Sequence, residues 1–325
     1  MQYSNKYMQS IRTLLELIKG EPYLYIQTHD FPDHDAVAAA FGLQYMLNEQ
    51  GIQSYIIYEG SIQRDSLIRM TEELTISIDH IVDHSIHPDN KIILVDGCKG
   101  NKNVRDLPGE ELAVIDHHNS PAPEDVPFVD IRPEYGSCST LIYTYLDELG
   151  LTIPQNIASA LMIGLLVDTA HLSRGMSEAD ITCHSNLYGK ADIGVVNSIL
   201  RNNIQKQDLK YYKEVLNEVT IENRVAFYCF ENGCSQNLLG ILSDFFLSIQ
   251  EVHFVFFCAI NEDRINLSVR SEKPEWNAAK ILQTIQGGIV FGSGHPDIAG
   301  GVVLDPSLFD IERCYQELKQ LLKVE

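Results

Sequence analysis

The sequence lacks any apolar run long enough to cross a membrane. Its longest candidate, residues 254–260, has the length of a strand, whereas a membrane-spanning helix needs about 20 consecutive apolar residues. The N-terminus also lacks the charged region and apolar stretch of a secretion signal. We therefore expect a cytoplasmic protein without a membrane partner.

The cysteines lack the pattern of a disulfide framework or a redox motif. Their number is seven, which is odd, and no two of them have the Cys-x-x-Cys spacing. Such a distribution indicates buried thiols in a reducing compartment. It agrees with the expected cytoplasmic location.

Basic residues are scarce beside acidic ones. The chain has 24 lysines and arginines against 45 aspartates and glutamates, and its formal net charge is -21. Long nucleic acids are bound through many lysine and arginine contacts with phosphate, so this charge opposes binding to a long duplex. If the substrate is a nucleic acid, we expect it to be short.

The order of the expected elements favours an α/β protein with two domains. Residues 1–190 alternate between apolar strand-like runs and helices such as the one at 36–50, which is the order of a parallel sheet. A helical connector at 191–219 follows, with one polar helix over 195–218. Residues 220–325 contain more strands and fewer helices. We expect an N-terminal domain with a mostly parallel sheet flanked by helices, and a smaller α+β C-terminal domain.

Acids and histidines gather in four short segments where secondary-structure elements should end. These segments are residues 29–35, 95–96, 116–118 and 168–169. The first three follow apolar strand-like runs, and ligands of open α/β sheets bind at the carboxyl ends of the strands. We expect the four segments to form one metal site.

Electrostatics indicates what such a site would hold. If Asp33, Asp35, Asp96 and Asp168 converge, each pair of like charges about 4 Å apart costs roughly 4 kcal/mol at an effective dielectric constant of about 20. Bare carboxylates would take up protons or move apart. Two divalent cations would cancel the charge. Carboxylate oxygens mixed with imidazole nitrogens suit Mn²⁺, with Mg²⁺ or Co²⁺ as alternatives, better than a structural zinc.

Two parts of the chain resemble a known family. The His-x-x-Pro-Asp-x-Asp-Ala motif at 29–36 and the Asp-His-His triplet at 116–118 are similar to motifs of DHH-family phosphoesterases, which are named for this triplet. Downstream, the Arg-Ser pair at 270–271 and the glycine-rich segment 291–301 are similar to the DHH-associated C-terminal domain. The resemblance implies a catalytic first domain, a substrate-binding second domain, and an active site in the cleft between them.

The resemblance also implies two sets of metal ligands that share one carboxylate. The sets are His29, Asp33 and Asp96, and Asp35, Asp96, His117 and Asp168. Asp96 would bridge the two cations, and His118 would face the substrate phosphate or the leaving group. Asp96 and His118 are therefore the implied catalytic residues. The implied reaction is hydrolysis by in-line attack of a metal-bridging hydroxide on phosphorus.

The glycine-rich segment offers a second anion site. Glycines let backbone amides approach an anion, and Arg270 can grip a phosphate through two parallel hydrogen bonds. Taken alone, the glycines would also fit a tight turn. We expect a loop here, and the resemblance implies substrate contacts from these residues: His118, Arg270, Ser271, Gly292, Gly294 and His295.

Several positions depart from the family pattern. Phe31 stands where an arginine is common, which would weaken a phosphate contact or favour a stacked base. Ala170 and His171 replace the glycine-containing sequence that usually follows Asp-Thr, and Ser293 interrupts the glycine triplet. These departures leave the choice of substrate open.

Among the family activities, the two-domain architecture favours the group that resembles nano-RNases. We expect hydrolysis of very short oligonucleotides to mononucleotides, and of 3'-phosphoadenosine 5'-phosphate as a further substrate. An exopolyphosphatase or another small phosphoanhydride hydrolase would use the same metals without a base pocket. Outside the enzymes, the alternative is a nucleotide-binding regulator without turnover. A homodimer is left open.

Overall fold

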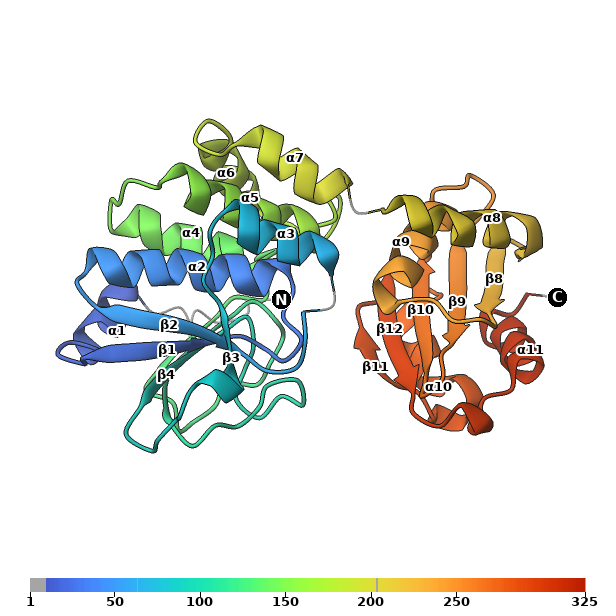
Figure 1. The fold of residues 1–325 in the computed structure, drawn as a ribbon, viewed down its shortest axis with the longest axis horizontal. Coiled ribbons are helices and arrows are strands. Elements are labelled where there is room, and N and C mark those ends of the chain that lie inside the picture. Colours follow the sequence, from blue (N-terminus) through green and yellow to red (C-terminus); the bar gives the residue numbers. More distant parts are fainter. Residues whose placement is uncertain (1–9, 63, 203, 325) are drawn as a thin grey trace. The chain divides into compact units, whose positions relative to one another are not determined.

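The computed structural model describes residues 10–62, 64–202 and 204–324, and Figure 1 shows the fold as a ribbon. The chain divides into two compact units, Met1–Asn203 and Ile204–Glu325. Each unit contains a six-stranded sheet and its own apolar clusters. This organisation confirms the expected α/β architecture with two parts.

The sheet of the first unit is parallel throughout, as the alternation of strands and helices predicts. Its strand order is β3-β2-β1-β4-β5-β6. The strands are β1 Tyr23–Gln27, β2 Gln53–Tyr58, β3 Asp79–His80, β4 Lys91–Val95, β5 Glu110–Asp116 and β6 Phe128–Ile131. The strand order reverses between β1 and β4: β2 and β3 follow β1 toward one edge of the sheet, and β5 and β6 follow β4 toward the other. Ligands of open α/β sheets bind at such a switch point, beyond the carboxyl ends of the strands.

The helices of the first unit cover one face of this sheet. They are α1 Ile11–Leu17, α2 His34–Glu49, α3 Asp65–Glu73, α4 Cys138–Glu148, α5 Gln155–Asp168, α6 Glu178–Tyr188 and α7 Ile193–Arg201. Their buried residues share one apolar cluster with Leu24 and Ile26 of β1, and Figure 1 shows α2 to α7 on the same side. Tyr25 points to the opposite face, where the loop residues Cys98 and Leu107 and the short helix η1 Ile81–Asp83 complete a second cluster.

The second unit is built on a mixed sheet with the order β11-β12-β10-β9-β8-β7, in which β8 and β9 are parallel. The strands are β7 Thr220–Glu222, β8 Val225–Phe230, β9 Phe254–Ile260, β10 Ile265–Ser271, β11 Phe291–Gly294 and β12 Ile298–Val303. The helical segments are η2 Lys206–Asp208, α8 Leu209–Glu218, α9 Gln236–Leu247, α10 Ala278–Thr284, η3 Ile285–Gly288, η4 Pro306–Leu308 and α11 Ile311–Leu322. Apolar clusters lie on both faces of the sheet. None of the helices described here has the length and apolarity that a membrane span requires.

The expectation of one helix over 195–218 is wrong. The structure has two helices, because α7 ends at Arg201 and α8 begins at Leu209. Between them, the backbone N–H of Gln205 donates to the carboxylate of Asp208 at 2.8 Å. A side chain that bonds the nearby backbone competes with a continuous helix, and the periodicity of the sequence does not reveal this competition.

Candidate metal centre

The loop between β1 and α2 places two expected ligands at the start of a helix. Asp33 is the N-cap of α2, and its Oδ1 accepts hydrogen bonds from the N–H groups of Asp35 and Ala36 at 3.0 and 3.2 Å. Nδ1 of His29 lies 2.8 Å from the carbonyl oxygen of Asp30. Because a carbonyl oxygen only accepts hydrogen bonds, Nδ1 carries the proton. Nε2 of His29 then faces the centre, 4.0 Å from Asp33 Oδ1.

The carboxylate of Asp33 is held in its charged form. Burial opposes ionisation, but the charges of His29 and Arg64 outweigh it and lower the pKa of Asp33 to about 2. Arg64 is the N-cap residue of α3. Asp33 therefore remains a negatively charged oxygen donor at neutral pH.

Asp96 lies between the two histidines that face the centre. Its Oδ2 is 3.8 Å from His29 Nε2, and its Oδ1 is 3.4 Å from His117 Nε2. The residue follows β4 with a φ of 57°, a left-handed conformation that costs about 1–2 kcal/mol outside glycine. Its N–H donates to the carbonyl of Ile115 on β5 at 2.9 Å, which holds this conformation. This strained backbone conformation places the Asp96 carboxylate between the two histidines, and strain of this kind is typical of functional sites.

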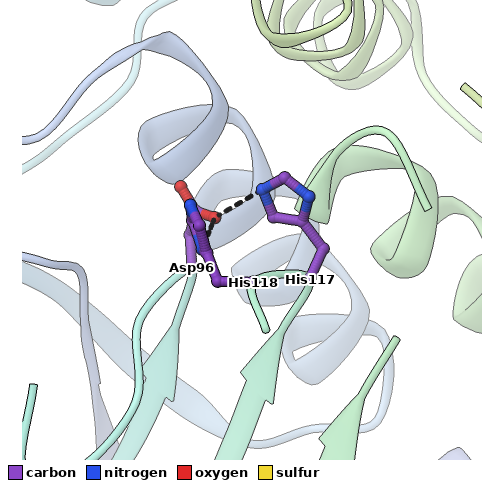
Figure 2. A group of neighbouring side chains, drawn as sticks. All are labelled: Asp96, His117 and His118. Carbon is purple, nitrogen blue, oxygen red and sulfur yellow. Dashed lines mark ion pairs between the residues drawn. The ribbon is translucent and has the colours of Figure 1, made fainter. Parts of the chain in front are cut away.

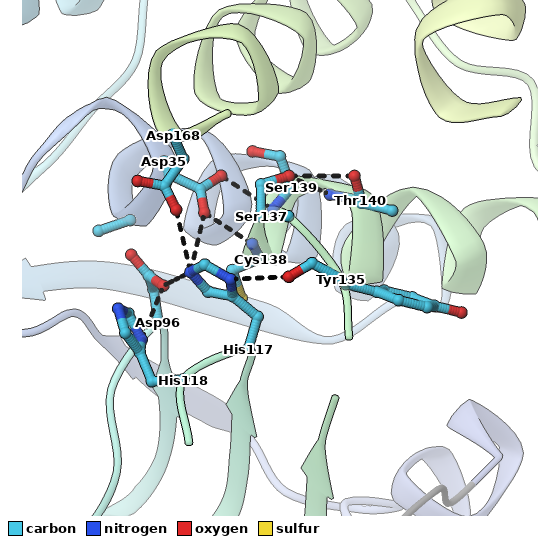
Figure 3. A network of polar contacts seen from close by, with 12 residues as sticks. Asp35, Asp96, His117, His118, Tyr135, Ser137, Cys138, Ser139, Thr140 and Asp168 are labelled. Atoms are coloured by element: carbon cyan, nitrogen blue, oxygen red, sulfur yellow. Dashed lines mark hydrogen bonds and ion pairs between the residues drawn. The ribbon is translucent and has the colours of Figure 1, made fainter. Parts of the chain in front are cut away.

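His117 points one nitrogen at three carboxylates (Figure 3). Its Nδ1 donates to the carbonyl of Tyr135 at 3.2 Å, so Nε2 is the atom that faces the acids. Nε2 lies 3.1 Å from Asp168 Oδ2, 3.4 Å from Asp96 Oδ1 and 3.9 Å from Asp35 Oδ2. Among the described residues, neither His117 Nε2 nor Asp96 Oδ1 has a hydrogen-bond partner of regular geometry, although both are buried.

Asp35 is fixed by the N-terminus of α4. Its Oδ2 accepts the N–H of Cys138 at 2.6 Å, and its Oδ1 accepts the N–H of Ser139 at 2.9 Å. A helix N-terminus carries partial positive charge and unpaired N–H groups, which suit a carboxylate. Figure 3 shows both contacts from α4 to Asp35. The helix thereby sets the direction in which this carboxylate faces the centre.

A buried acid on α6 anchors the start of α4 in turn. Asp180 accepts the N–H of Gly136 at 2.9 Å, the hydroxyl of Thr140 at 2.5 Å, and the N–H and hydroxyl of Ser177 at 2.6 and 2.7 Å. The carboxylate is completely buried. Breaking such a network costs more than losing one exposed hydrogen bond, because the remaining groups are left unpaired. Asp180 thus holds the helix that holds Asp35.

The acids of the centre repel one another, and this repulsion identifies what the group can bind. Burial, with Asp96 and Asp168 nearby, raises the pKa of Asp35 well above its usual value. Burial lowers the pKa of His117, but the adjacent Asp168 and Asp96 outweigh it and raise that pKa well above the usual value. Protons are therefore favoured where the carboxylates crowd, and a divalent cation would supply the same charge more effectively.

The side chains form overlapping groups that could each hold a metal ion. The groups are His29, Asp33 and Asp96; Asp35, His117 and Asp168; and Asp96, His117 and His118, and the ligand atoms within each lie within 4.8 Å of one another. Figure 2 shows Asp96 beside both histidines. The structure brings together all six side chains that the sequence nominates as ligands. Their oxygen and nitrogen donors fit Mn²⁺ and similar divalent cations.

His118 has a different environment from its neighbour. Its Nδ1 is 2.8 Å from Asp116 Oδ1, and its backbone N–H donates to the same oxygen at 3.1 Å. Burial lowers the pKa of His118, but the hydrogen bond with Asp116 and the charge of Asp96 outweigh it and raise the pKa to about 9. Asp116, the last residue of β5, is fully buried. Sequence reasoning missed its role, although the acid immediately before the two histidines is visible in the triplet.

The turn after Asp168 shows how this chain does without the usual glycine. Ala170, His171 and Leu172 all have positive φ, at 46°, 58° and 62°. The N–H of His171 donates to the carbonyl of Leu166 at 2.7 Å, and the N–H of Leu172 donates to the hydroxyl of Thr169 at 3.1 Å. These bonds hold a turn that glycine would form at lower cost.

In the second unit, the expected phosphate-binding residues lie at one end of the sheet. Arg270 is on β10, where its Nε donates to the Asp244 carboxylate and its guanidinium donates to the hydroxyl of Ser268 at 3.1 Å. The hydroxyl of Ser271 bonds the backbone of Lys273. The guanidinium is therefore already paired with a carboxylate, which the sequence did not indicate.

The expectation of a loop at the glycine-rich segment 291–301 is wrong, because the segment forms the hairpin of β11 and β12. Gly292 pairs with Gly301 across the two strands, and a Cβ at Gly292 would lie 2.5 Å from the carbonyl oxygen of Gly300. The glycines thus permit close strand approach. His295 begins the turn, where its N–H donates to Ile298 at 2.7 Å. The turn is next to Arg270, which pairs with Ile298 in the sheet.

The two units match two known domain families. Residues 23–165 match the DHH family, N-terminal domain, and residues 222–324 match the DHHA1 domain. The protein belongs to the DHH family. This membership confirms the resemblance that the motifs at 29–36 and 116–118 indicated.

Curated relatives of this DHH-family protein match it over different lengths. A protein of Methanocaldococcus jannaschii is 27% identical over 99% of this chain and 67% of its own length. Cyclic-di-AMP phosphodiesterase GdpP of Bacillus subtilis is 25% identical over 85% of this chain and 45% of its own length. A probable manganese-dependent inorganic pyrophosphatase of Streptococcus thermophilus is 24% identical over 48% of this chain and 51% of its own length. The chain thus spans about half to two thirds of these relatives.

Solved structures share the fold. An exopolyphosphatase-related protein from Bacteroides fragilis has a TM-score of 0.80 at 19% identity, covering 96% of this chain and 95% of that one. RecJ of Thermus thermophilus, solved in complex with Mn²⁺, has a TM-score of 0.58 at 16% identity, covering 96% of this chain and 54% of that one. At these identities the likeness shows the fold and leaves the substrate to other observations.

We expect Asp96→Asn to remove most of the response of the protein to divalent cations. Asparagine keeps the size of the side chain and tolerates the positive φ of this position, so the fold should survive. The wild-type protein should gain about 2.7 kcal/mol of stability at a Mn²⁺ concentration about 100 times the dissociation constant. Thermal unfolding with and without Mn²⁺ measures the gain.

The matched control is Asp147→Asn, because Asp147 is exposed at the opposite end of α4 from the centre. It should respond to Mn²⁺ as the wild-type protein does. If Mn²⁺ stabilises Asp96→Asn as strongly as the wild type, Asp96 is not a ligand.

Gly164→Ala should disturb the centre through packing alone. A Cβ at this position of α5 would lie 2.3 Å from Ser139 Oγ and 2.8 Å from Asp35 Oδ1. Overpacking typically costs about 1–3 kcal/mol, and the shift of Asp35 should also weaken Mn²⁺ binding. Urea unfolding and Mn²⁺ titration measure the two effects. Gly189→Ala is the matched control, because a Cβ there meets nothing within 4 Å; equal behaviour of the two variants would contradict the prediction.

The metal-free protein should lose stability as the pH rises from about 6.5 to about 9. The pKa of His118 is raised in the folded protein from 6.5 to about 9, so its contribution is complete below pH 6.5 and is lost as the pH rises through 9. Asp35, whose folded-state pKa is also raised, changes stability in the same direction. Urea unfolding in a chelator across this range measures the slope.

His118→Gln should make this slope shallower, because glutamine does not titrate. The matched control is His184→Gln on α6, where His184 packs against Tyr188, and its slope should equal that of the wild type. Stability that rises with pH over this window would show that the assigned sign is wrong.

Proposed function

We propose that this DHH-family enzyme hydrolyses short oligonucleotides to mononucleotides with the help of two divalent cations, which we expect to be Mn²⁺. Three residues, His29, Asp33 and Asp96, would hold one cation. The other would be held by Asp35, Asp96, His117 and Asp168. Bound cations of this kind lower the pKa of a water molecule and neutralise charge on phosphate oxygens. The observation that carries the proposal is the convergence of buried and half-buried carboxylates on the Nε2 atoms of His29 and His117.

The protein's own residues supply orientation and a proton. Tyr135 and Asp30 accept the Nδ1 protons of His117 and His29, which directs both Nε2 atoms toward the acids. Such partners fix the tautomer and the ring orientation of ligating histidines. Asp116 keeps His118 positively charged at neutral pH, so His118 can donate to a phosphate oxygen or protonate the leaving oxygen.

Two observations support a short nucleotide as the substrate class. The match with the cyclic-di-AMP phosphodiesterase of Bacillus subtilis extends over 85% of this chain, whereas the match with the pyrophosphatase covers 48%. The net charge of -21 opposes binding to long nucleic acids. We therefore propose dinucleotides and similarly short oligonucleotides, with 3'-phosphoadenosine 5'-phosphate as a further substrate.

The second unit is the proposed substrate-binding domain. Arg270, Ser271 and the hairpin residues Gly292, Gly294 and His295 meet at one end of its sheet. Asp244, which pairs with Arg270, would have to share this guanidinium with a substrate phosphate. The five N–H groups of this guanidinium already have acceptors within the unit, so a substrate phosphate would have to displace one or more of these contacts.

Hydrolysis of inorganic phosphoanhydrides is the second candidate. The sequence match with manganese-dependent inorganic pyrophosphatases favours it, because the metal ligands proposed here would serve either reaction. Pyrophosphate and polyphosphate carry no base, so recognition of a base separates the two candidates. A nucleotide-binding regulator without turnover is a third interpretation.

Product analysis tests these proposals. The purified protein is incubated with Mn²⁺ and, separately, a 5'-labelled dinucleotide, a longer oligonucleotide, 3'-phosphoadenosine 5'-phosphate and polyphosphate. We expect preferential conversion of the dinucleotide and a loss of at least about 100-fold in Asp96→Asn, because the variant removes the shared carboxylate. Asp147→Asn should retain full activity.

Each of the other outcomes would contradict a different part of the proposal. Release of phosphate from polyphosphate without conversion of the dinucleotide would keep the metal centre and overturn the substrate. Mn²⁺-dependent binding of nucleotides without any hydrolysis would support the regulator. Activity that survives in Asp96→Asn would contradict the proposed role of the shared carboxylate.

A further inference from the structure

Phe31 combines an exposed aromatic ring with a strained backbone beside the metal centre. The residue is 53% exposed, and its φ is 56°, a region that bulky residues rarely adopt. It lies in the loop between β1 and α2, two residues from both His29 and Asp33. A strained and exposed aromatic residue is costly to keep, so its position points to a use.

The surrounding chain holds the ring in place. The N–H of Phe31 donates to the carbonyl of Glu59 at 2.9 Å, which maintains the positive φ. Gly60 follows, and a Cβ there would lie only 2.8 Å from two ring carbons. The ring therefore lies against the backbone of Gly60. Any residue with a side chain at position 60 would displace the ring. The residue as a whole nevertheless remains about half exposed.

The loop itself is braced from a second direction. The N–H of Asp30 donates to the carbonyl of Asn103 at 2.6 Å, and Asp30 Oδ1 accepts the N–H of Arg105 at 3.2 Å. Arg105 also pairs with Glu59 at 3.1 Å. These contacts tie the Phe31 loop to the segments that follow β2 and β4. The ring is a preorganised surface, which keeps the entropy cost of binding low.

The ring and the centre are suited to the two ends of a nucleotide. A base stacks on an aromatic face with little dependence on its identity, whereas a phosphate needs the charge of the metal centre. Arg64, the N-cap residue of α3, adds positive charge near Asp33. Inorganic pyrophosphate and polyphosphate would leave the exposed ring unused.

We propose that Phe31 is the stacking surface for a nucleobase whose phosphate lies at the metal centre. The inference rests on the proposed nucleotide hydrolysis and extends it, because it makes Phe31 the residue that selects nucleotides over inorganic phosphates. Phe31 is a specificity residue here and takes no part in the bond-breaking step.

Kinetics of Phe31→Ala provides the first test. Its KM for a dinucleotide should rise roughly 5- to 100-fold, the range expected for losing one base stack, while kcat changes little. Phe31→Tyr should restore the wild-type KM. The matched control is Tyr188→Ala, since Tyr188 is a similarly exposed aromatic residue on α6. An unchanged KM in Phe31→Ala, with turnover of the dinucleotide intact, would overturn the inference and leave the proposed function standing.

A binding test works without turnover, in the presence of Mg²⁺, because the phosphate needs the charge of the metal centre. The chain has one tryptophan, Trp276, so Phe31→Trp combined with Trp276→Phe gives a single fluorophore at the proposed surface. Adenosine monophosphate should quench it, and inorganic phosphate should not. Tyr188→Trp in the same background should respond to neither.

The two tests separate the inference from the function on which it rests. Quenching in the tryptophan variant without dinucleotide hydrolysis by the wild type would refute the proposed function and keep the nucleobase surface. Absence of quenching, or equal quenching by phosphate, would refute the surface. If Phe31→Ala lowers the melting temperature and impairs all substrates equally, the ring has a packing role and the inference is also wrong.

Discussion

The mutual repulsion of buried carboxylates is the constraint on which the rest of this protein depends. Asp35, Asp96 and Asp168 all lie within 4 Å of Nε2 of His117, and burial denies Asp35 and Asp96 the screening of water. Such a group persists only if positive charge is supplied, by protons in the metal-free protein or by divalent cations. The pKa values of Asp35 and His117 are raised for this reason, because a bound proton reduces the net negative charge of the group. The fold must therefore hold the acids against their own repulsion.

Three features of the first unit supply that restraint. The switch point of the parallel sheet places the ends of β1, β4 and β5 side by side, which brings their following loops together. The N-terminus of α4 binds both oxygens of Asp35, and Asp180 of α6 holds the start of that helix. Gly164 lets α5 approach Asp35 without a side chain between them. Through packing or hydrogen bonds, each feature holds the acids in an arrangement that their mutual repulsion would otherwise disrupt.

The adjacent histidines show how partners outside the centre decide chemical roles. His117 donates to a backbone carbonyl and turns its other nitrogen to the acids, while His118 donates to a buried carboxylate and retains a positive charge. With a cation bound, His117 would offer it a neutral donor atom, whereas His118 would remain a charged group. The proposed role of Phe31 extends this division of labour to the substrate, because its exposed ring offers an apolar face beside the charged side chains of the centre.

The sequence by itself indicated the parallel α/β unit, because apolar periodicity is a local pattern. The motifs shared with the family named the six expected ligands, whose side chains the structure brings together. It did not reveal the break between α7 and α8, the pairing of Arg270 with Asp244, or the roles of Asp116 and Asp180. The break and the role of Asp116 rest on hydrogen bonds between residues only three and two positions apart. The other two features depend on which side chains meet across distant segments. Only the tertiary structure decided them, since a hydrogen bond between residues 44 positions apart, as between Gly136 and Asp180, leaves no trace in the spacing of either.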